Sequence, residues 1–167
     1  MDVSIVMPVY NERGAIRESL GRVLETGIPG EIIIVDDGSL DGTREVLKDI
    51  EQAHRHACVL KVVYQPKNQG KGAAVRRGFQ EISNSIVIIQ DADLEYNPSE
   101  YMTLITPILE DKADVVYGSR FLGGPHRVLY FWHALGNKLL TLVSNMFTNV
   151  NLSDMETGYK AFHRSVL

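Results

Sequence analysis

Two aspartates separated by one residue, Asp91 and Asp93, are the side chains of this sequence best suited to chemistry. In an extended segment their carboxylates point the same way, and Glu95 could add a third. Neighbouring anions repel unless a cation joins them, and carboxylates suit Mg²⁺ or Mn²⁺, which bind through one or two carboxylates and substrate phosphates. The alternative is that the pair forms a turn before a helix beginning near Pro98. The motif alone does not choose between these interpretations.

A second acidic segment, residues 36–43 (DDGSLDGT), directly follows an apolar run. It cannot hold phosphates as a basic glycine-rich loop does. Asp36 and Asp37 can instead accept hydrogen bonds from a nucleobase N–H or a ribose hydroxyl. We also expect Asp41 or Thr43 to cap the helix that follows, and capping alone would account for the acidic residues.

Residues 68–74 (NQGKGAA) place two glycines and Lys71 where a helix is predicted to begin. Backbone N–H groups and the helix dipole could contact a pyrophosphate there. The spacing matches neither G-x-x-x-x-G-K-[ST] nor G-x-G-x-x-G, so a P-loop nucleotidase and a Rossmann dehydrogenase lose their main support.

The segments that must position these residues alternate between strand and helix patterns. Short apolar runs predict five strands, at residues 3–9, 31–35, 59–64, 85–90 and 114–117. Helical spacing of apolar residues predicts four amphipathic helices between them, around residues 16–24, 46–50, 74–79 and 101–108. Such alternation indicates an α/β fold with a mainly parallel sheet covered on both faces. Ligands bind beyond the carboxyl ends of such strands, where the polar segments lie.

The stretch from Val128 to Val150 predicts a further amphipathic helix. Its apolar stripe steps by three or four residues: Val128, Phe131, Leu135, Leu139, Leu142, Met146 and Val150. A polar stripe runs beside it: His133, Asn137, Thr141, Ser144 and Thr148. We expect the apolar stripe to pack on the sheet. The alternative is contact with a membrane surface, which the aromatic residues 130–132 favour. The stretch is too polar to span a bilayer.

Composition and charge exclude several classes of protein. The chain has 167 residues, 44% hydrophobic and 23% charged, which predicts one folded domain over 1–167 and excludes disordered and fibrous classes. A net charge of -4 argues against a nucleic-acid partner. Residues 1–119 hold 12 Lys and Arg against 19 Asp and Glu, whereas residues 120–167 hold five against two. The acidic and the basic parts are different regions.

The sequence also carries an expectation about compartment. Cys58 is the single cysteine, so no intrachain disulfide can form, which fits a reducing compartment. The first ten residues, MDVSIVMPVY, match neither a signal peptide nor a transit peptide. We expect a cytoplasmic protein.

Taken together, six motifs in order along the chain resemble family 2 glycosyltransferases with the GT-A fold. They are residues 8–12 (PVYNE), 36–43, 71–74 (KGAA), 91–93 (DAD), 118–120 (GSR) and 154–160 (DMETGYK). Within that family the chain looks most like the dolichyl-phosphate or bacterial polyprenyl-phosphate mannosyl- and glucosyltransferases.

The resemblance implies a donor site for a nucleotide sugar. It implies that five residues hold the base and ribose: Pro8, Tyr10, Glu12, Asp36 and Asp37. It places Lys71 near the donor and gives Asp91 and Asp93 the metal on the diphosphate.

The resemblance also implies an acceptor site, in which Arg120 meets a phosphate. Two departures affect the site residues. The branch often has Gln where this chain has Glu95, a candidate third metal ligand. Many members carry Arg and Ser on the acceptor helix where this chain has His133 and Asn137.

We therefore expect a GT-A domain that uses Mg²⁺ or Mn²⁺ to move a hexose from a UDP- or GDP-sugar to polyprenyl phosphate, with inversion, in peripheral contact with the cytoplasmic membrane face. Residues 1–119 would form the nucleotide-sugar and metal half and 120–167 the acceptor side. Members usually continue well beyond the segment matching residues 154–162, so we expect a C-terminal truncation.

Three alternatives to this function are a transferase for a saccharide hydroxyl, a non-catalytic sugar-nucleotide-binding domain, and a sugar-phosphate nucleotidyltransferase. The last should show a glycine-rich, arginine-containing signature after the first strand. Residues 8–12 do not match that signature.

Overall fold

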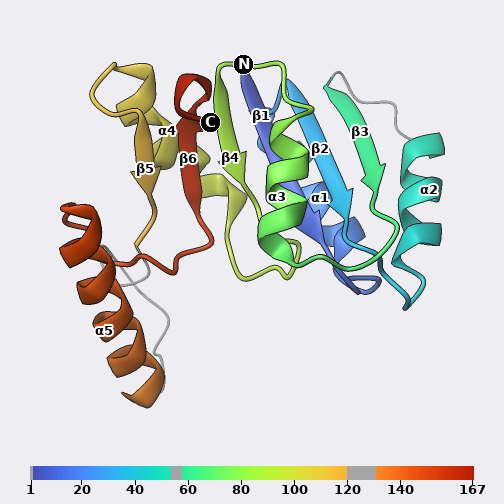
Figure 1. Cartoon of the computed structure of the whole chain (residues 1–167). Coiled ribbons are helices and arrows are strands. Elements are labelled where there is room, and N and C mark those ends of the chain that lie inside the picture. The colour runs from blue at the N-terminus through green and yellow to red at the C-terminus, as the bar shows by residue number, and fades with distance from the viewer. Residues whose placement is uncertain (1, 54–57, 120–130) are drawn as a thin grey trace.

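The computed structural model describes residues 2–53, 58–119 and 131–167 (Figure 1). Within these residues, six strands form one sheet in the order β3-β2-β1-β4-β6-β5. The strands are β1 (Val3–Val9), β2 (Glu31–Asp36), β3 (Val59–Tyr64), β4 (Ile86–Ile89), β5 (Val115–Tyr117) and β6 (Lys160–His163).

The sheet is mainly parallel, as the sequence predicts. β1 pairs in parallel with β2 and β4, and β2 pairs in parallel with β3. The exception is β6, which runs antiparallel between β4 and β5. The sequence analysis missed β6 because Lys160 and His163 at its ends interrupt the apolar pattern of a buried strand.

Helices cover both faces of the sheet, which confirms the predicted layers. They are α1 (Ile16–Glu25), α2 (Thr43–Ala53), α3 (Lys71–Phe79) and α4 (Tyr101–Leu109). The described residues also form helix α5 (Phe131–Thr148) and the short 3-10 turns η1 (Pro98–Glu100) and η2 (Arg164–Val166). In Figure 1, α3 lies in front of the sheet and α1 and α4 lie behind it.

The core divides between the two faces because strand residues alternate. Val6 and Ile33 point toward α3, where they join Ala74 in one apolar cluster. Ile5 and Ile32 belong to the larger cluster behind the sheet. These strands are buried on both faces, so the carboxyl ends of β1, β2 and β4 are held rigidly at one edge.

Helix α5 overturns one expectation. Its apolar stripe does not pack on the sheet: Met146 is 74% exposed, and Leu139 and Leu142 are more than half exposed. Two residues of the polar stripe are buried instead, Asn137 at 4% and Thr141 at 6% exposed. Figure 1 shows α5 standing beside the sheet rather than over either face.

Hydrogen bonds explain this orientation. The Asn137 amide donates to Asp154 Oδ1 (3.1 Å), and Thr141 Oγ1 accepts from the Met155 N–H (3.2 Å). Asn145 also bonds both backbone groups of Leu152. Burying these polar groups requires partners, and the segment before β6 supplies them. No helix in the described residues is long and apolar enough to cross a membrane.

Candidate functional site

A cavity of about 280 Å³ opens at the carboxyl edge of the sheet, where the segments after β1, β2, β3 and β4 meet. It is lined by every residue predicted for the donor site except Asp36: Pro8, Tyr10, Glu12, Asp37, Lys71, Asp91 and Asp93. These residues are up to 85 positions apart in the sequence. Parallel strands bring them together because their carboxyl ends share one edge of the sheet.

Asp36, the predicted donor residue that does not line the cavity, is fully buried. Its Oδ2 accepts from Arg44 Nε at 2.6 Å, and its carboxylate also faces the Ser39 N–H. Arg44 donates in addition to the Gln65 carbonyl. Asp36 thus joins the start of α2 to the end of β3 beneath the site.

Asp37 lies at the cavity wall and ties two loops together. Its Oδ1 accepts from the Gln69 N–H (2.9 Å) and its Oδ2 from the Gly70 N–H (2.7 Å). The loops pack closely at Gly38, where a Cβ would collide with the backbone of Asn68. Gly38 also has a φ of 77°, which other residues rarely adopt. Asp37 therefore fixes the residues that lead into Lys71.

Asp91 is held in place from several directions. The Gln90 amide donates to the Asp91 carbonyl (2.9 Å), and Gln90 accepts in turn from the buried Tyr101 hydroxyl (2.8 Å). Gly158 lies so close to Asp91 Oδ2 that any Cβ there would overlap it. At the open side, Lys71 Nζ lies 2.6 Å from Asp91 Oδ1.

The sequence motifs do not predict that Gln90, Tyr101 and Gly158 support Asp91. The helical period of the apolar residues places Tyr101 on the apolar face of a helix and gives no sign of its hydroxyl contact. A glutamine at the end of the apolar run 86–89 was the available signal, since a buried amide needs partners.

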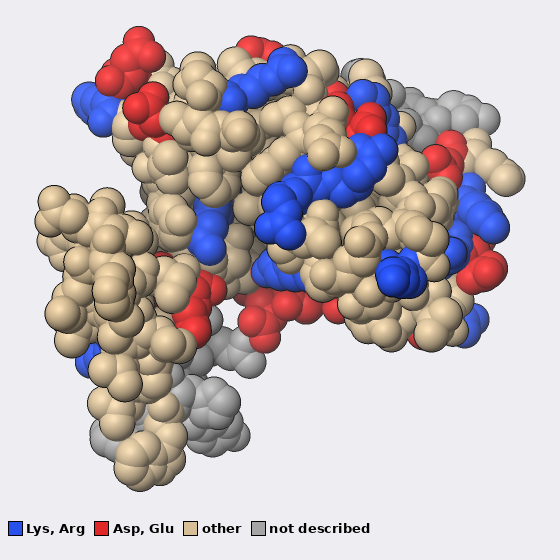
Figure 2. Space-filling model, in the orientation of Figure 1, with Lys and Arg blue, Asp and Glu red and all other residues tan. Residues whose placement is uncertain are grey.

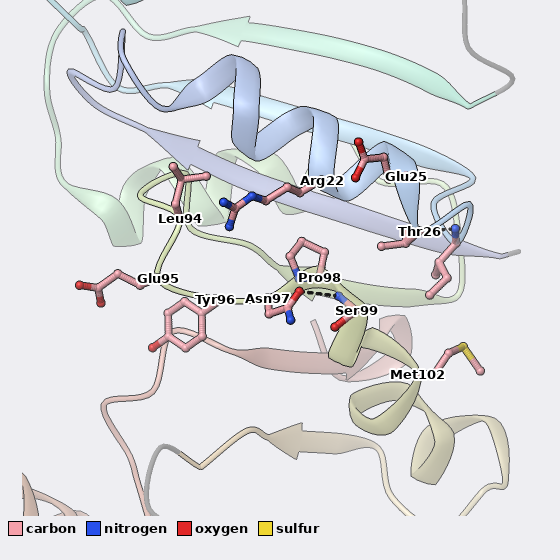
Figure 3. A pocket seen from close by; sticks show the side chains of 11 residues that line it. Arg22, Glu25, Thr26, Leu94, Glu95, Tyr96, Asn97, Pro98, Ser99 and Met102 are labelled. Carbon is pink, nitrogen blue, oxygen red and sulfur yellow. Dashed lines mark hydrogen bonds between the residues drawn. The ribbon is translucent and has the colours of Figure 1, made fainter. Parts of the chain in front are cut away.

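Asp93 is exposed at the rim of the cavity, and its Oδ1 accepts from the Glu95 N–H (3.0 Å). Glu95 itself lines a different cavity of about 660 Å³, which lies between α1 and the start of α4 (Figure 3). The structure therefore does not bring Glu95 into the same cavity as Asp91 and Asp93. Among the residues that the structure describes, no group of three or more His, Cys, Asp or Glu could hold a metal.

Negative charge accumulates in the cavity that contains Asp91 and Asp93. Burial raises the pKa of Glu12, and the nearby carboxylates of Asp93, Asp41 and Asp91 raise it further. A cation would relieve this repulsion. Asp91 and Asp93 fit a divalent cation, because Mg²⁺ and Mn²⁺ need only one or two carboxylates when substrate phosphates and waters complete the coordination. An ammonium group already sits on Asp91.

Of the three predicted acceptor side chains, the structure describes that of Asn137. Arg120 and the side chain of His133 lie outside the described part of the structure. Asn137 is buried against Asp154 and does not line the donor cavity. The structure thus assembles the donor side of the predicted site.

Comparison with known proteins identifies the family. The model of glycosyl transferase family 2 matches residues 4–167. The chain therefore belongs to glycosyl transferase family 2, as its six motifs predict.

Two curated proteins are similar to this chain in sequence. The chain is 33% identical over 169 residues to an undecaprenyl-phosphate 4-deoxy-4-formamido-L-arabinose transferase of Pseudomonas savastanoi pv. phaseolicola, covering 99% of this chain and 48% of the relative. It is 31% identical over 172 residues to a dolichol-phosphate mannosyltransferase of Pyrococcus furiosus, covering 100% of this chain and 47% of the relative. The chain thus spans about half the length of these relatives.

Solved structures confirm the GT-A fold. Glucosyl-3-phosphoglycerate synthase from Mycobacterium tuberculosis, in complex with Mn²⁺, UDP and phosphoglyceric acid, has a TM-score of 0.73 at 22% identity over 99% of this chain and 56% of its own. A mannosyltransferase from Pyrobaculum calidifontis, in complex with GDP-Man and Mn²⁺, has a TM-score of 0.55 at 28% identity over 60% of this chain and 30% of its own.

Proposed function

We propose that this chain moves a hexose from a UDP- or GDP-sugar to polyprenyl phosphate, with Mg²⁺ or Mn²⁺ at Asp91 and Asp93 and inversion at the anomeric carbon. The observation that carries the proposal is the single cavity in which Asp37, Lys71, Asp91 and Asp93 meet. Two relatives named for lipid-phosphate transfer and two neighbours with Mn²⁺ and GDP-Man or UDP support it.

The donor is held by groups that complement its parts. Asp91 and Asp93 would hold the cation, which offsets the charge of the diphosphate and of the leaving group. Lys71 and the N–H groups at the start of α3 meet the phosphates. Pro8, Tyr10, Glu12 and Asp37 lie on the remaining wall, where base and ribose would be held. We infer that Asp36 acts on that wall indirectly, through Arg44.

A phosphate acceptor needs a cationic side chain to position it, but it needs no general base to remove a proton. A phosphate is ionised near neutral pH, so its oxygen can attack the anomeric carbon without giving a proton to the protein. Arg120 fits the task of orienting that phosphate through a bidentate contact. The basic balance of residues 120–167 supports an anionic acceptor.

The acceptor proposal has its own test, the variant Arg120→Lys. It should raise the KM for polyprenyl phosphate far more than the KM for the donor, because Lys is a point charge without the planar fork. An unchanged acceptor KM, or a preference for a neutral sugar hydroxyl, would remove polyprenyl phosphate from the proposal and leave the family assignment intact.

Helix α5 supports peripheral contact with the cytoplasmic membrane face. Its outer surface is almost uncharged in Figure 2, and Trp132, Leu139, Met146 and Phe147 are exposed on it. Such a surface suits the boundary between lipid headgroups and acyl chains, where a polyprenyl phosphate presents its phosphate. We infer that residues 120–167 form the acceptor side of one domain.

Donor binding can be tested by thermal shift. A panel of UDP- and GDP-sugars with Mn²⁺ should contain a ligand that stabilises the protein by about 2.7 kcal/mol at 100 times its Kd. The same ligand should stabilise far less when EDTA removes the cation. No stabilisation by any nucleotide sugar would contradict the proposed donor, and stabilisation without turnover would favour a non-catalytic binding domain.

A further inference from the structure

Lys71 and Asp91 form an ion pair at the centre of the proposed cation site. The Lys71 ammonium lies 2.6 Å from Oδ1 and 2.7 Å from Oδ2 of Asp91, so it engages both oxygens. The Lys71 side chain is 55% exposed, whereas that of Asp91 is only 14% exposed. The ammonium group of the exposed Lys71 side chain therefore contacts the largely buried carboxylate of Asp91.

The two partners differ in their freedom to move. Asp91 is fixed by the bond from Gln90 to its carbonyl and by the backbone of Gly158 against its carboxylate. Lys71 reaches the site through a flexible four-carbon stem with its ammonium near the surface. If the pair separates, Lys71 must be the side that moves.

The position of Lys71 in its helix also points to an anion. It is the first residue of α3, and no acidic residue accompanies it in the first turn. A cation at a helix N-terminus is disfavoured by the dipole, so Lys71 needs a negative partner. Figure 2 shows Lys and Arg gathered over α3, to which Arg76 and Arg77 also belong. Asp91 neutralises Lys71 in the structure as it stands.

We propose that Lys71 holds the place of the divalent cation in the ligand-free protein and leaves Asp91 for the diphosphate when metal and nucleotide bind. This inference rests on the proposed function. A metal that arrives alone must compete with the ammonium for Asp91. A nucleoside diphosphate offers Lys71 another anion, so nucleotide and metal each strengthen the binding of the other by the same factor.

The variant Lys71→Gln tests this coupling with readouts that do not depend on turnover. Free Mn²⁺ measured by electron paramagnetic resonance gives metal affinity without nucleotide, and calorimetry at saturating Mn²⁺ gives the affinity for UDP and GDP. Mn²⁺ alone should bind about twofold to fivefold more tightly to the variant, the range expected for losing an exposed ion pair. The nucleotide should bind more weakly. Damage to the fold would weaken both affinities.

Lys67→Gln is the matched control, because Lys67 is an exposed lysine of the loop that leads into α3 and its loss changes the net charge equally. It should bind Mn²⁺ as the wild type does. If Lys71→Gln binds Mn²⁺ no more tightly than Lys67→Gln, Lys71 does not hold the place of the metal. If Mn²⁺ fails to bind the wild type even with UDP or GDP present, the proposed cation site itself is wrong.

Discussion

Asp36 and Asp37 are adjacent residues that the structure gives different partners. Asp36 pairs with the Arg44 side chain below the cavity, and Asp37 accepts two backbone N–H groups at its wall. The first arrangement links an element to its neighbour, and the second shapes the surface that a donor would meet.

Substitution should separate the two aspartates. Asp36→Asn should lower the free energy of unfolding by about 1–3 kcal/mol, because it weakens a charge-assisted bond to a fully buried side chain. Asp37→Asn should weaken donor binding by about tenfold or more, because its amide cannot accept both N–H groups with two ionised oxygens. Urea unfolding and donor titration measure the two effects. Unchanged donor affinity in Asp37→Asn would make that residue a structural turn only.

For Asp36 and Asp37, the sequence predicts their position at the edge of the sheet but not their hydrogen-bond partners. The acidic motif after an apolar strand predicted a ligand-binding edge, and the cavity contains Asp37 as expected. Beyond the nearby Ser39 N–H, the partners of the two carboxylates come from residues 44, 69 and 70. Contacts over such separations depend on how β2, β3 and their loops pack, which residue types alone do not specify.

Among the elements of the fold, Glu31 links neighbouring segments at the edge of the sheet opposite the cavity. This buried carboxylate at the start of β2 accepts from Ser4 Oγ (2.5 Å), from the Ser83 N–H (2.5 Å) and hydroxyl (2.9 Å), and from the Asn84 N–H (3.2 Å). Burial alone would raise the pKa of Glu31, but these hydrogen bonds outweigh it and lower the pKa below its usual value. Glu31 thus connects β1 and β2 to the segment before β4.

The lowered pKa predicts how stability depends on pH. A carboxylate with a lower pKa in the folded state contributes stability above its unfolded value of 4.5, and this is lost as pH falls through the folded pKa. Glu31→Gln should cost about 1.5–3 kcal/mol near pH 7 and flatten the fall in stability below pH 4.5. Urea unfolding across pH measures both, with Glu45→Gln on exposed α2 as the control for one lost carboxylate. Parallel curves for wild type and Glu31→Gln would contradict the assignment.

Helix α5 marks a second limit of sequence reasoning. The apolar period located the helix correctly, but it did not reveal which stripe faces the protein. That depends on Asp154 and Met155, which lie beyond the helix and bond Asn137 and Thr141. The strands were easier to predict because continuous apolar runs such as β2 are buried on both faces and leave no choice of side.

The exposed stripe of α5 predicts membrane contact that can be measured. Leu139→Glu combined with Met146→Glu should reduce binding to vesicles of neutral and anionic phospholipids at least about tenfold, because each apolar side chain buried is worth about 1.5–3 kcal/mol. The melting temperature should stay close to that of the wild type, since both side chains are exposed. Leu40→Glu, at another exposed apolar residue, is the matched control. Equal vesicle binding by the α5 variant and the control would exclude this surface.

In the whole molecule, the cavity that contains Asp91 and Asp93 lies at the carboxyl edge of the sheet. Helix α5 stands beside the sheet, bonded to Asp154 through Asn137 and with its apolar stripe exposed. The segment 154–158 connects the two parts, because Asp154 binds α5 while Gly158 lies against Asp91. This arrangement suits the proposed function, in which the donor comes from water and the acceptor from a membrane.

Metal-dependent sugar transfer can be measured as turnover. The chain is mixed with polyprenyl phosphate and a UDP- or GDP-hexose in Mn²⁺ or Mg²⁺, with and without excess EDTA. We expect transfer that stops when EDTA is added. Asp93→Asn should abolish transfer without loss of fold, and Asp49→Asn, at an exposed position of α2, should leave transfer intact. Full transfer in excess EDTA, or by Asp93→Asn, would contradict metal-dependent transfer.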